Sequence, residues 1–194
     1  MKKHLLIGFF VGLCVFFVGL GIMTFLNQSH QEYSIGGEFK AMSTKGEVAL
    51  SDFHEKVTMI FFGFTYCPDI CPTTLSTMNK AIKRLPEEKR DQVQVLFMTL
   101  DPKRDTLDKL KEYTGFFNPQ FLGLRIADEQ KLNAVLKQYA VTYKSFVPEG
   151  KSAEEYTLDH STQSYLIGKD GKIREVIHHG SSPQHIAKLL ERYL

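Results

Sequence analysis

The chain has 194 residues, of which 24 are basic, 22 are acidic and three are cysteine. This length accommodates one globular domain and a tail, and a domain of this size does not need its cysteines as a disulfide scaffold. The first 29 residues hold two lysines and no acid, so the remainder has 22 residues of each sign. Nucleic acid is therefore not an expected partner.

The N-terminal segment Leu5–Leu26 is 22 residues long and carries no charge. At about 1.5 Å per residue, a helix of this length crosses a bilayer core of about 30 Å. Two lysines precede it, so the short end should stay in the cytoplasm and the rest of the chain outside. A cleaved signal peptide is the alternative, but no small-residue cleavage site follows. We expect residues 1–26 to be a signal anchor that spans the membrane once, 27–35 a linker and 36–194 one domain.

A small hairpin and a buried strand are predicted next. Apolar and polar residues alternate in Glu38–Ala41 and again in Glu47–Leu50, which indicates two short paired strands. Val57–Thr65 is a nearly continuous apolar run, typical of a strand that is buried on both faces. A helix is expected to begin near Pro68 or Pro72, either of which could take its first position, and to end before Pro86.

A second buried strand is predicted at Val93–Leu100, and it ends in the polar turn Asp101–Thr106. Within this turn Asp105 is a good helix N-cap, because an aspartate side chain can accept hydrogen bonds from the first backbone N–H groups. The helix that follows is expected to end at Phe117.

The next part of the chain is expected to hold a short strand, a helix and a long loop. The strand is predicted at Phe121–Ala127 and the helix at Glu129–Tyr139. Lys144–Tyr156 is polar and too long for a tight turn, so we expect a mobile surface loop.

The C-terminal part is predicted to form a hairpin and a closing helix. Thr162–Ile167 and Ile173–His178 flank an Asp-Gly turn, which is a strong hairpin signal. Ser182 is expected to cap the last helix, with Pro183 in its first turn. Strands and helices alternate early and a hairpin with a helix comes late, so we predict an α/β fold with a mixed β-sheet flanked by helices on both faces. This order of elements resembles that of thioredoxin-like proteins.

Cys67 and Cys71 lie where the first buried strand gives way to a helix. The N-terminus of a helix carries free N–H groups and the positive end of the helix dipole, which lower the pKa of a nearby thiol. Cysteines at positions i and i+4 lie on one side of a helix, and two thiolates favour Cu(I) or Zn over Mg or Ca. A metal site would need a further ligand. Two packed cysteines or a structural disulfide remain alternatives.

His160 is a candidate further ligand. It ends the long polar segment just before a strand that a thioredoxin-like order would place beside the cysteine loop. Asp159 could orient its imidazole or cap the turn. His178 and His179 are expected to be ordinary residues, because neighbouring residues of a strand point to opposite faces.

Three segments resemble the motifs of the Sco/SenC family, which are assembly proteins for the copper site of cytochrome c oxidase. The segments are Gly63–Pro72 with the sequence GFTYCPDICP, Asp101–Thr106 with DPKRDT, and Asp159–Ser161 with DHS. They occur in the family order, and the similarity extends from about Gly36 to the C-terminus. One such motif alone would be weak evidence, whereas the three together are specific.

The resemblance implies a thioredoxin-like domain in residues 36–194 in which Cys67, Cys71 and His160 bind one copper ion, as Cu(I) or Cu(II). It further implies a metallochaperone that delivers copper to the dinuclear copper (CuA) site on subunit II of cytochrome c oxidase. The absence of an Arg/Ser-rich transit sequence suggests a bacterial protein. We expect a monomer, anchored in the cell membrane with its domain on the extracytoplasmic face.

A second role remains open for the same cysteines. Cys67 and Cys71 could be the redox-active pair of a thiol:disulfide oxidoreductase that keeps the cysteines of the oxidase copper site reduced. By the same resemblance, Asp101, Arg104 and Asp105 would support or present the site, although no physical argument makes them ligands.

Overall fold

The computed structural model describes residues 35–194, so the predicted membrane anchor and nearly all of the predicted linker lie outside the described residues. Within 35–194, no helix combines the length and the apolar character that a membrane crossing requires. In chain order the described elements are β1 (Lys40–Ser43), β2 (Gly46–Ala49), the 3₁₀ helix η1 (Leu50–Phe53), β3 (Val57–Gly63), α2 (Ile70–Ile82), α3 (Glu87–Arg90), β4 (Val93–Thr99), α4 (Leu107–Phe117), β5 (Leu122–Leu124), α5 (Glu129–Gln138), β6 (Tyr143–Phe146), the 3₁₀ helix η2 (Ala153–Glu155), β7 (Thr157–His160), β8 (Ser164–Ile167), β9 (Ile173–Ile177) and α6 (Pro183–Tyr193).

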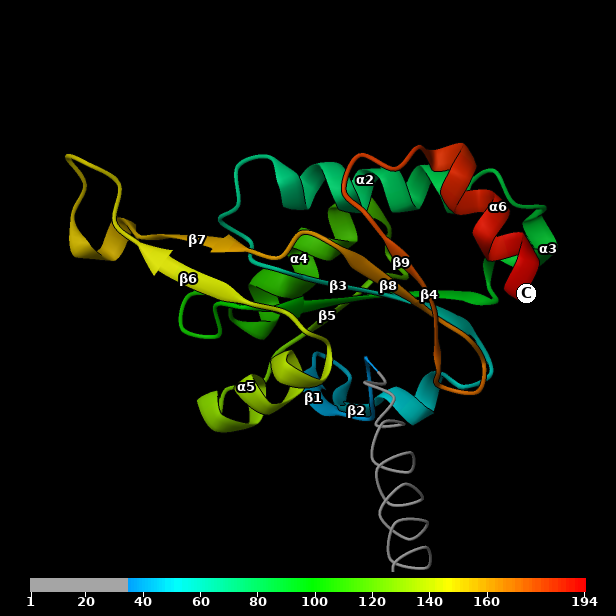
Figure 1. The fold of residues 1–194 in the computed structure, drawn as a ribbon, viewed down its shortest axis with the longest axis horizontal. Helices are drawn as coiled ribbons and strands as arrows, with labels where there is room; N and C mark the ends of the chain where they lie inside the picture. Colours follow the sequence, from blue (N-terminus) through cyan, green and yellow to red (C-terminus); the bar gives the residue numbers. More distant parts are fainter. Residues whose placement is uncertain (1–34) are drawn as a thin grey trace, which may run out of the picture. The chain divides into compact units, whose positions relative to one another are not determined.

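The central sheet has five strands in the order β5-β4-β3-β8-β9 (Figure 1). Strands β3, β4 and β5 run parallel, whereas β8 is antiparallel to both β3 and β9. Helices α2 and α6 lie on one side of the sheet, and α5 with the β1–β2 hairpin lies on the other (Figure 1). The predicted mixed sheet with helices on both faces is confirmed.

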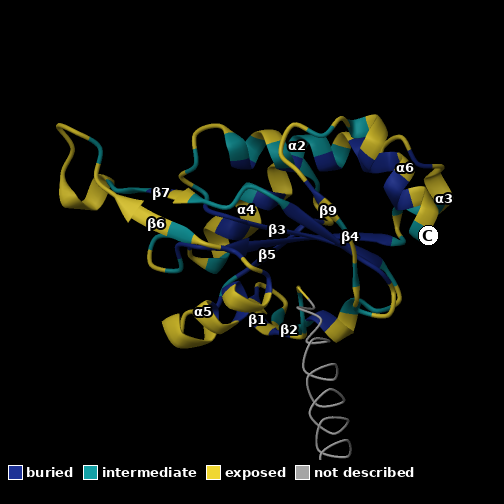
Figure 2. Cartoon of the chain, in the orientation of Figure 1, coloured by how far each residue is buried: buried dark blue, intermediate teal, exposed yellow. Residues whose placement is uncertain are grey.

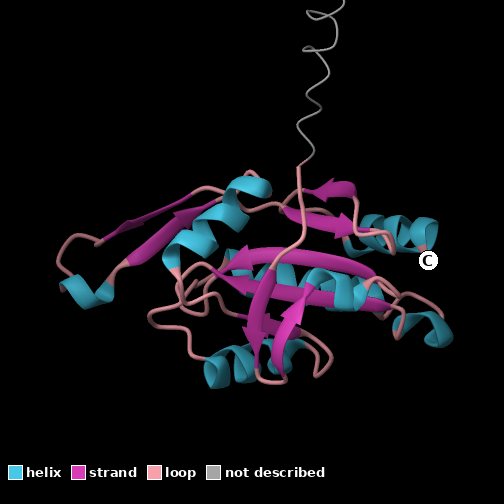
Figure 3. Ribbon diagram, turned by 90° about the horizontal axis from the view of Figure 1, so that it is seen from below, coloured by secondary structure: helices cyan, strands magenta, loops and turns pink. Residues whose placement is uncertain are grey.

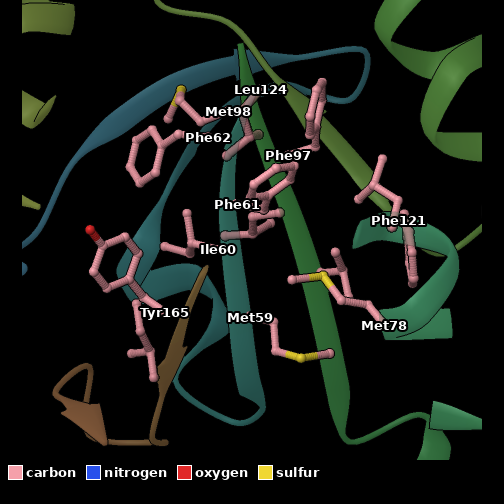
Figure 4. Packing of buried hydrophobic residues seen from close by; sticks show 14 of the residues in the cluster. Met59, Ile60, Phe61, Phe62, Met78, Phe97, Met98, Phe121, Leu124 and Tyr165 are labelled. Atoms are coloured by element: carbon pink, nitrogen blue, oxygen red, sulfur yellow. The ribbon is translucent and has the colours of Figure 1, made fainter. Parts of the chain in front are cut away.

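Strands β3 and β4 form the buried centre, and every residue of both is buried. Alternate residues of β3 face opposite layers, as the pleat of a strand requires. Phe61 packs on Phe97, with ring centroids 6.0 Å apart, while Phe62 packs on Tyr139 at 5.3 Å and on Tyr165 at 6.2 Å (Figure 4). The nearly continuous apolar sequence of β3 therefore reflects burial on both faces.

The parallel register of β3 and β4 brings two of the sequence motifs to one edge of the sheet. Val57 pairs with Val93 at one end and Gly63 with Thr99 at the other. The cysteine segment follows β3 and the Asp101–Thr106 turn follows β4, so both begin side by side at the carboxyl ends of these strands.

Helix α2 begins at Ile70, with Asp69 as its N-cap. The expectation that a proline takes the first helical position is wrong, because Pro72 is the third residue. That position is tolerated because the N–H groups of the first turn have no partner within the helix. Cys71 is the second residue of α2, so the predicted place of the cysteines between the first buried strand and a helix is confirmed.

The predicted N-cap of α6 is confirmed, and that of α4 is wrong. The Ser182 hydroxyl accepts a hydrogen bond from the His185 N–H at 3.2 Å. Helix α4 is instead capped by Thr106, whose hydroxyl accepts from the Lys109 N–H. Asp105 is completely buried, because its side chain points between the strand ends rather than at the helix.

The segment predicted to be a mobile loop is partly a strand. Strand β6 pairs with β7, from Tyr143 opposite His160 to Phe146 opposite Thr157. Together they form a two-stranded arm that extends away from the five-stranded sheet (Figures 1 and 3). Most of β6 and the tip of the arm are exposed (Figure 2). An exposed strand need not alternate apolar and polar residues, so no strand pattern marks this segment.

Candidate metal centre

The two cysteines lie on either side of the start of α2. Cys67 is on the turn between β3 and the helix and is partly exposed, whereas Cys71 is in the first helical turn and has no exposed surface. The backbone N–H of Cys71 donates to the Cys67 sulfur at 3.4 Å. The Cys67 sulfur thus accepts one of the N–H groups that a helix leaves unpaired at its N-terminus.

His160 is the last residue of β7, and its ring lies close to the sulfurs. Its Nε2 lies 3.7 Å from the Cys71 sulfur. Its Nδ1 lies 2.7 Å from the Ser161 carbonyl oxygen, which can accept a hydrogen bond from Nδ1–H and leave the Nε2 lone pair facing the sulfurs. The backbone of Ser161, rather than the exposed Asp159, therefore orients the imidazole.

These three residues bring one ligand atom each to the same place. The two sulfurs and a ring nitrogen of His160 all lie within 4.8 Å of one another. Metal–sulfur bonds of about 2.3 Å and metal–nitrogen bonds of about 2.0 Å place ligand atoms roughly 3.5–4 Å apart, so small movements would close the trio around one ion. These are the three residues that the sequence analysis proposed as copper ligands, and the structure brings them together.

The two thiols have opposite pKa shifts. A hydrogen bond from the Cys71 thiol, together with one from the Cys71 N–H, lowers the pKa of Cys67 to about 3 despite the opposing effect of burial. The pKa of Cys71 is raised, because its thiol donates that hydrogen bond and is buried beside a negative charge. The pair therefore holds one proton on Cys71 and presents Cys67 as a thiolate.

Gly63 forms the floor beneath the buried thiol. A Cβ atom at this position would lie 2.6 Å from the Cys71 sulfur and 2.8 Å from the Phe97 ring. Contacts this short cannot form without displacing a neighbour, so the thiol occupies space that only glycine leaves free.

Asp105 ties the cysteine loop to the ends of two strands. Its carboxylate accepts hydrogen bonds from the Thr65 N–H at 3.0 Å, the Thr65 hydroxyl at 2.5 Å and the Thr99 hydroxyl at 2.6 Å. Thr65 is two residues before Cys67, so this buried carboxylate fixes the start of the loop that carries the first thiol.

Comparison with known proteins agrees with this geometry. The sequence model of the SCO1/SenC family matches residues 27–194. The chain belongs to the SCO1/SenC family. A SCO2-like protein of Rickettsia felis is 39% identical over 167 residues, which are 86% of this chain and 80% of the relative.

Solved structures of Sco proteins share the fold. Bradyrhizobium japonicum ScoI with copper bound superposes with a TM-score of 0.73 at 33% identity, over 82% of this chain and 99% of that one. Arabidopsis thaliana ScoI with copper bound gives a TM-score of 0.74 at 28% identity, over 82% of this chain and 97% of the other.

Several features of this Sco/SenC chain could not be found by sequence reasoning. No local pattern marks Tyr156, yet its hydroxyl donates to Asp101 at 2.7 Å, and its carbonyl accepts from Arg104 at 2.7 Å. The role of Gly63 had one signal, its place at the end of a buried strand next to the cysteine loop. His179, by contrast, follows β9 and lies 3.3 Å from the Thr74 hydroxyl, outside the trio.

Proposed function

We propose that this chain is a membrane-anchored metallochaperone that delivers copper to the CuA site on subunit II of cytochrome c oxidase. Copper is held by Cys67, Cys71 and His160. The observation that carries the proposal is the convergence of these three ligand atoms within 4.8 Å. Solved relatives from Bradyrhizobium japonicum and yeast hold copper, and the Sco family takes part in assembling the oxidase.

The donor set suits copper in both oxidation states. Two thiolates are soft ligands that favour Cu(I), and an imidazole adds affinity for Cu(II). Because Cys67 is already a thiolate, only the Cys71 thiol must lose a proton when the metal binds.

The unequal burial of the ligands gives copper transfer a direction. Cys67 and His160 are partly exposed, whereas Cys71, in the first turn of α2, is buried. An incoming cysteine of the acceptor therefore reaches the ion from the side of Cys67 and His160. Ligand exchange then proceeds from these two residues, and Cys71 releases the metal last.

The proposed location follows from the N-terminal sequence. A signal anchor in residues 1–26 would hold a monomeric copper-binding domain on the extracytoplasmic face of a bacterial cell membrane. This is the side of the membrane on which an anchored domain could meet an oxidase subunit.

Copper titration of the reduced, metal-free chain tests the proposal. We expect about one copper ion per chain, with binding of both Cu(I) and Cu(II) lost in Cys67→Ser and Cys71→Ser because each removes a thiolate ligand. His160→Ala should weaken Cu(II) binding by at least about tenfold and Cu(I) binding less. Cys14→Ser removes the remaining thiol and is the matched control. Cu(II) affinity at the wild-type level in His160→Ala would contradict the three-ligand site.

A second candidate function rests on the thiolate character of Cys67. The partly exposed Cys67 thiolate can attack a disulfide of the oxidase subunit, which forms a mixed disulfide and releases one substrate thiol. The Cys71 thiol then attacks the Cys67 sulfur of this mixed disulfide and releases the second substrate thiol. The products are a Cys67–Cys71 disulfide and two substrate thiols, so the pair is oxidised as the substrate is reduced. Disulfide reduction by the metal-free chain that is unaffected by His160→Ala would favour this role.

A further inference from the structure

The guanidinium of Arg104 lies between two tyrosine rings. Its central carbon is 3.6 Å from the centroid of the Tyr156 ring and 4.6 Å from that of the Tyr66 ring. The side chain is only 17% exposed, and such cation–aromatic contacts are stronger when shielded from water. Arginine is suited to this position because its planar group can stack on aromatic faces.

The two tyrosines belong to the two segments that carry the proposed ligands. Tyr66 directly precedes Cys67, and Tyr156 directly precedes β7, whose last residue is His160. Arg104 belongs to neither segment, since it lies in the turn that follows β4. The stack therefore connects the cysteine loop to the histidine strand through a third part of the fold.

Arg104 is itself fixed to the sheet through Asp101. Its Nε donates to the Asp101 carboxylate at 2.5 Å, and the Asp101 N–H donates to the Thr99 hydroxyl at the end of β4. Its Nη1 donates to the Tyr156 carbonyl at 2.7 Å, while the Tyr156 hydroxyl donates to Asp101. Tyr156 is thus held at its ring, its carbonyl and its hydroxyl.

The histidine strand needs such an anchor. Strands β6 and β7 form a sheet of their own, and a pair of strands alone is marginally stable in water. Much of the arm is exposed (Figure 2). At the end of β7 next to His160, the Ser161 N–H donates to the Thr142 carbonyl at 2.9 Å. At the other end, the contacts of Tyr156 with Arg104 and Asp101 attach the arm to the turn after β4.

We infer that Arg104 is a positioning residue that couples the Cys67 loop to the His160 strand and so sets the affinity for Cu(II) relative to Cu(I). This inference rests on the proposed function. The cysteines are placed by β3 and α2 and can hold Cu(I) without the imidazole. Retention of Cu(II) depends on His160, whose backbone is placed by the arm and whose ring packs against Phe61 and Phe64. Loss of Arg104 therefore weakens the Cu(II) site selectively.

The variant Arg104→Gln in the full, reduced chain tests this inference. It keeps a polar side chain but loses the charge and most of the stacking surface. We expect its Cu(II) affinity to fall by about 10–100-fold, the range typical of residues that orient a metal ligand. Its Cu(I) affinity should stay at the wild-type level, and the nitrogen hyperfine coupling in the Cu(II) electron paramagnetic resonance spectrum should weaken.

Two further variants make the test specific. Arg174→Gln removes an arginine of β9 whose ion pair with Asp170 is a surface contact at 2.6 Å, and it should change neither affinity. Tyr156→Phe keeps the ring against Arg104 but loses the hydrogen bond to Asp101. It should fold even if Arg104→Gln does not, and should show a smaller selective loss of Cu(II) affinity.

The outcomes separate this inference from the proposed function. A folded Arg104→Gln chain with wild-type Cu(II) affinity would overturn the coupling, as would equal losses for the two copper ions. If Arg104→Gln does not fold, an unchanged Cu(II) affinity in Tyr156→Phe overturns it. A wild-type chain that binds neither ion would overturn the proposed copper site itself.

Discussion

At the scale of single residues, the two thiols differ in role although they are four positions apart. Cys67 lies on a turn at the N-terminus of a helix and accepts hydrogen bonds, which stabilises its thiolate. Cys71 lies in a pocket completed by Gly63 and keeps its proton. Placement within one helical turn therefore decides which sulfur is the partly exposed thiolate and which is the buried thiol.

This difference predicts an unusual pH dependence of alkylation. With a pKa of about 3, Cys67 is ionised throughout the range from pH 8 to pH 5, so its reaction with iodoacetamide should proceed at a nearly constant rate. An ordinary thiol with a pKa of about 8.5 would slow by roughly a thousandfold over this range. Peptide-resolved mass spectrometry of the reduced, metal-free chain measures the rate at each cysteine.

The denatured chain and a Cys71 variant show whether the low pKa of Cys67 depends on the native structure. In denaturant, Cys67 should regain the pH dependence of an ordinary thiol. Because its pKa is lower in the folded state, the native chain binds fewer protons at Cys67, and this contribution to stability is lost as the pH falls towards 3. Cys71→Ala removes the thiol donor and should raise the pKa of Cys67. A native chain that slows on acidification as much as the denatured chain would refute the assignment.

At the scale of elements, burial decides what the sequence can predict. Strand β3 and helix α6 have patterns that follow from their buried faces, and both were found where the sequence places them. Strand β6 has no comparable pattern because most of it is exposed. The candidate site was found through its three motifs, whereas the contacts that support it depend on distant partners such as Tyr156, which no local pattern indicates.

Asp105 shows the limit of local reasoning and yields a prediction. As a helix cap, it would contribute about 1 kcal/mol. As a buried acceptor for Thr65 and Thr99, it should contribute more, because Asp105→Ala leaves the buried Thr99 hydroxyl and the partly buried Thr65 donors without a partner. We expect Asp105→Ala to lower the free energy of unfolding by about 2–4 kcal/mol and Thr106→Ala, which removes the true cap, by about 1 kcal/mol. Urea denaturation measures the free energy of unfolding of both variants. Equal losses would contradict the role of Asp105 as a buried acceptor that ties the cysteine loop to the strand ends.

At the scale of the whole molecule, the fold brings together ligands that are far apart in the sequence. Cys71 and His160 are separated by 89 positions, yet their ligand atoms are 3.7 Å apart. The cysteines belong to the segment after the central strand β3, and the histidine belongs to an arm attached outside the main sheet. A bound ion would therefore be a cross-link between the core and the arm, which exists only in the folded chain.

This cross-link predicts that copper stabilises the reduced chain. A ligand that binds only the folded state at about 1,000 times its Kd adds about 4 kcal/mol. For a domain of this size, that corresponds to a rise in Tm of about 8–16 °C, less whatever copper the unfolded thiols hold. Differential scanning calorimetry with buffered Cu(I) measures the rise. Oxidation of Cys67 and Cys71 to a disulfide removes both thiolates and should abolish it, because the imidazole alone cannot bridge the arm to the core. An equal rise in the oxidised chain would mean that the metal binds elsewhere.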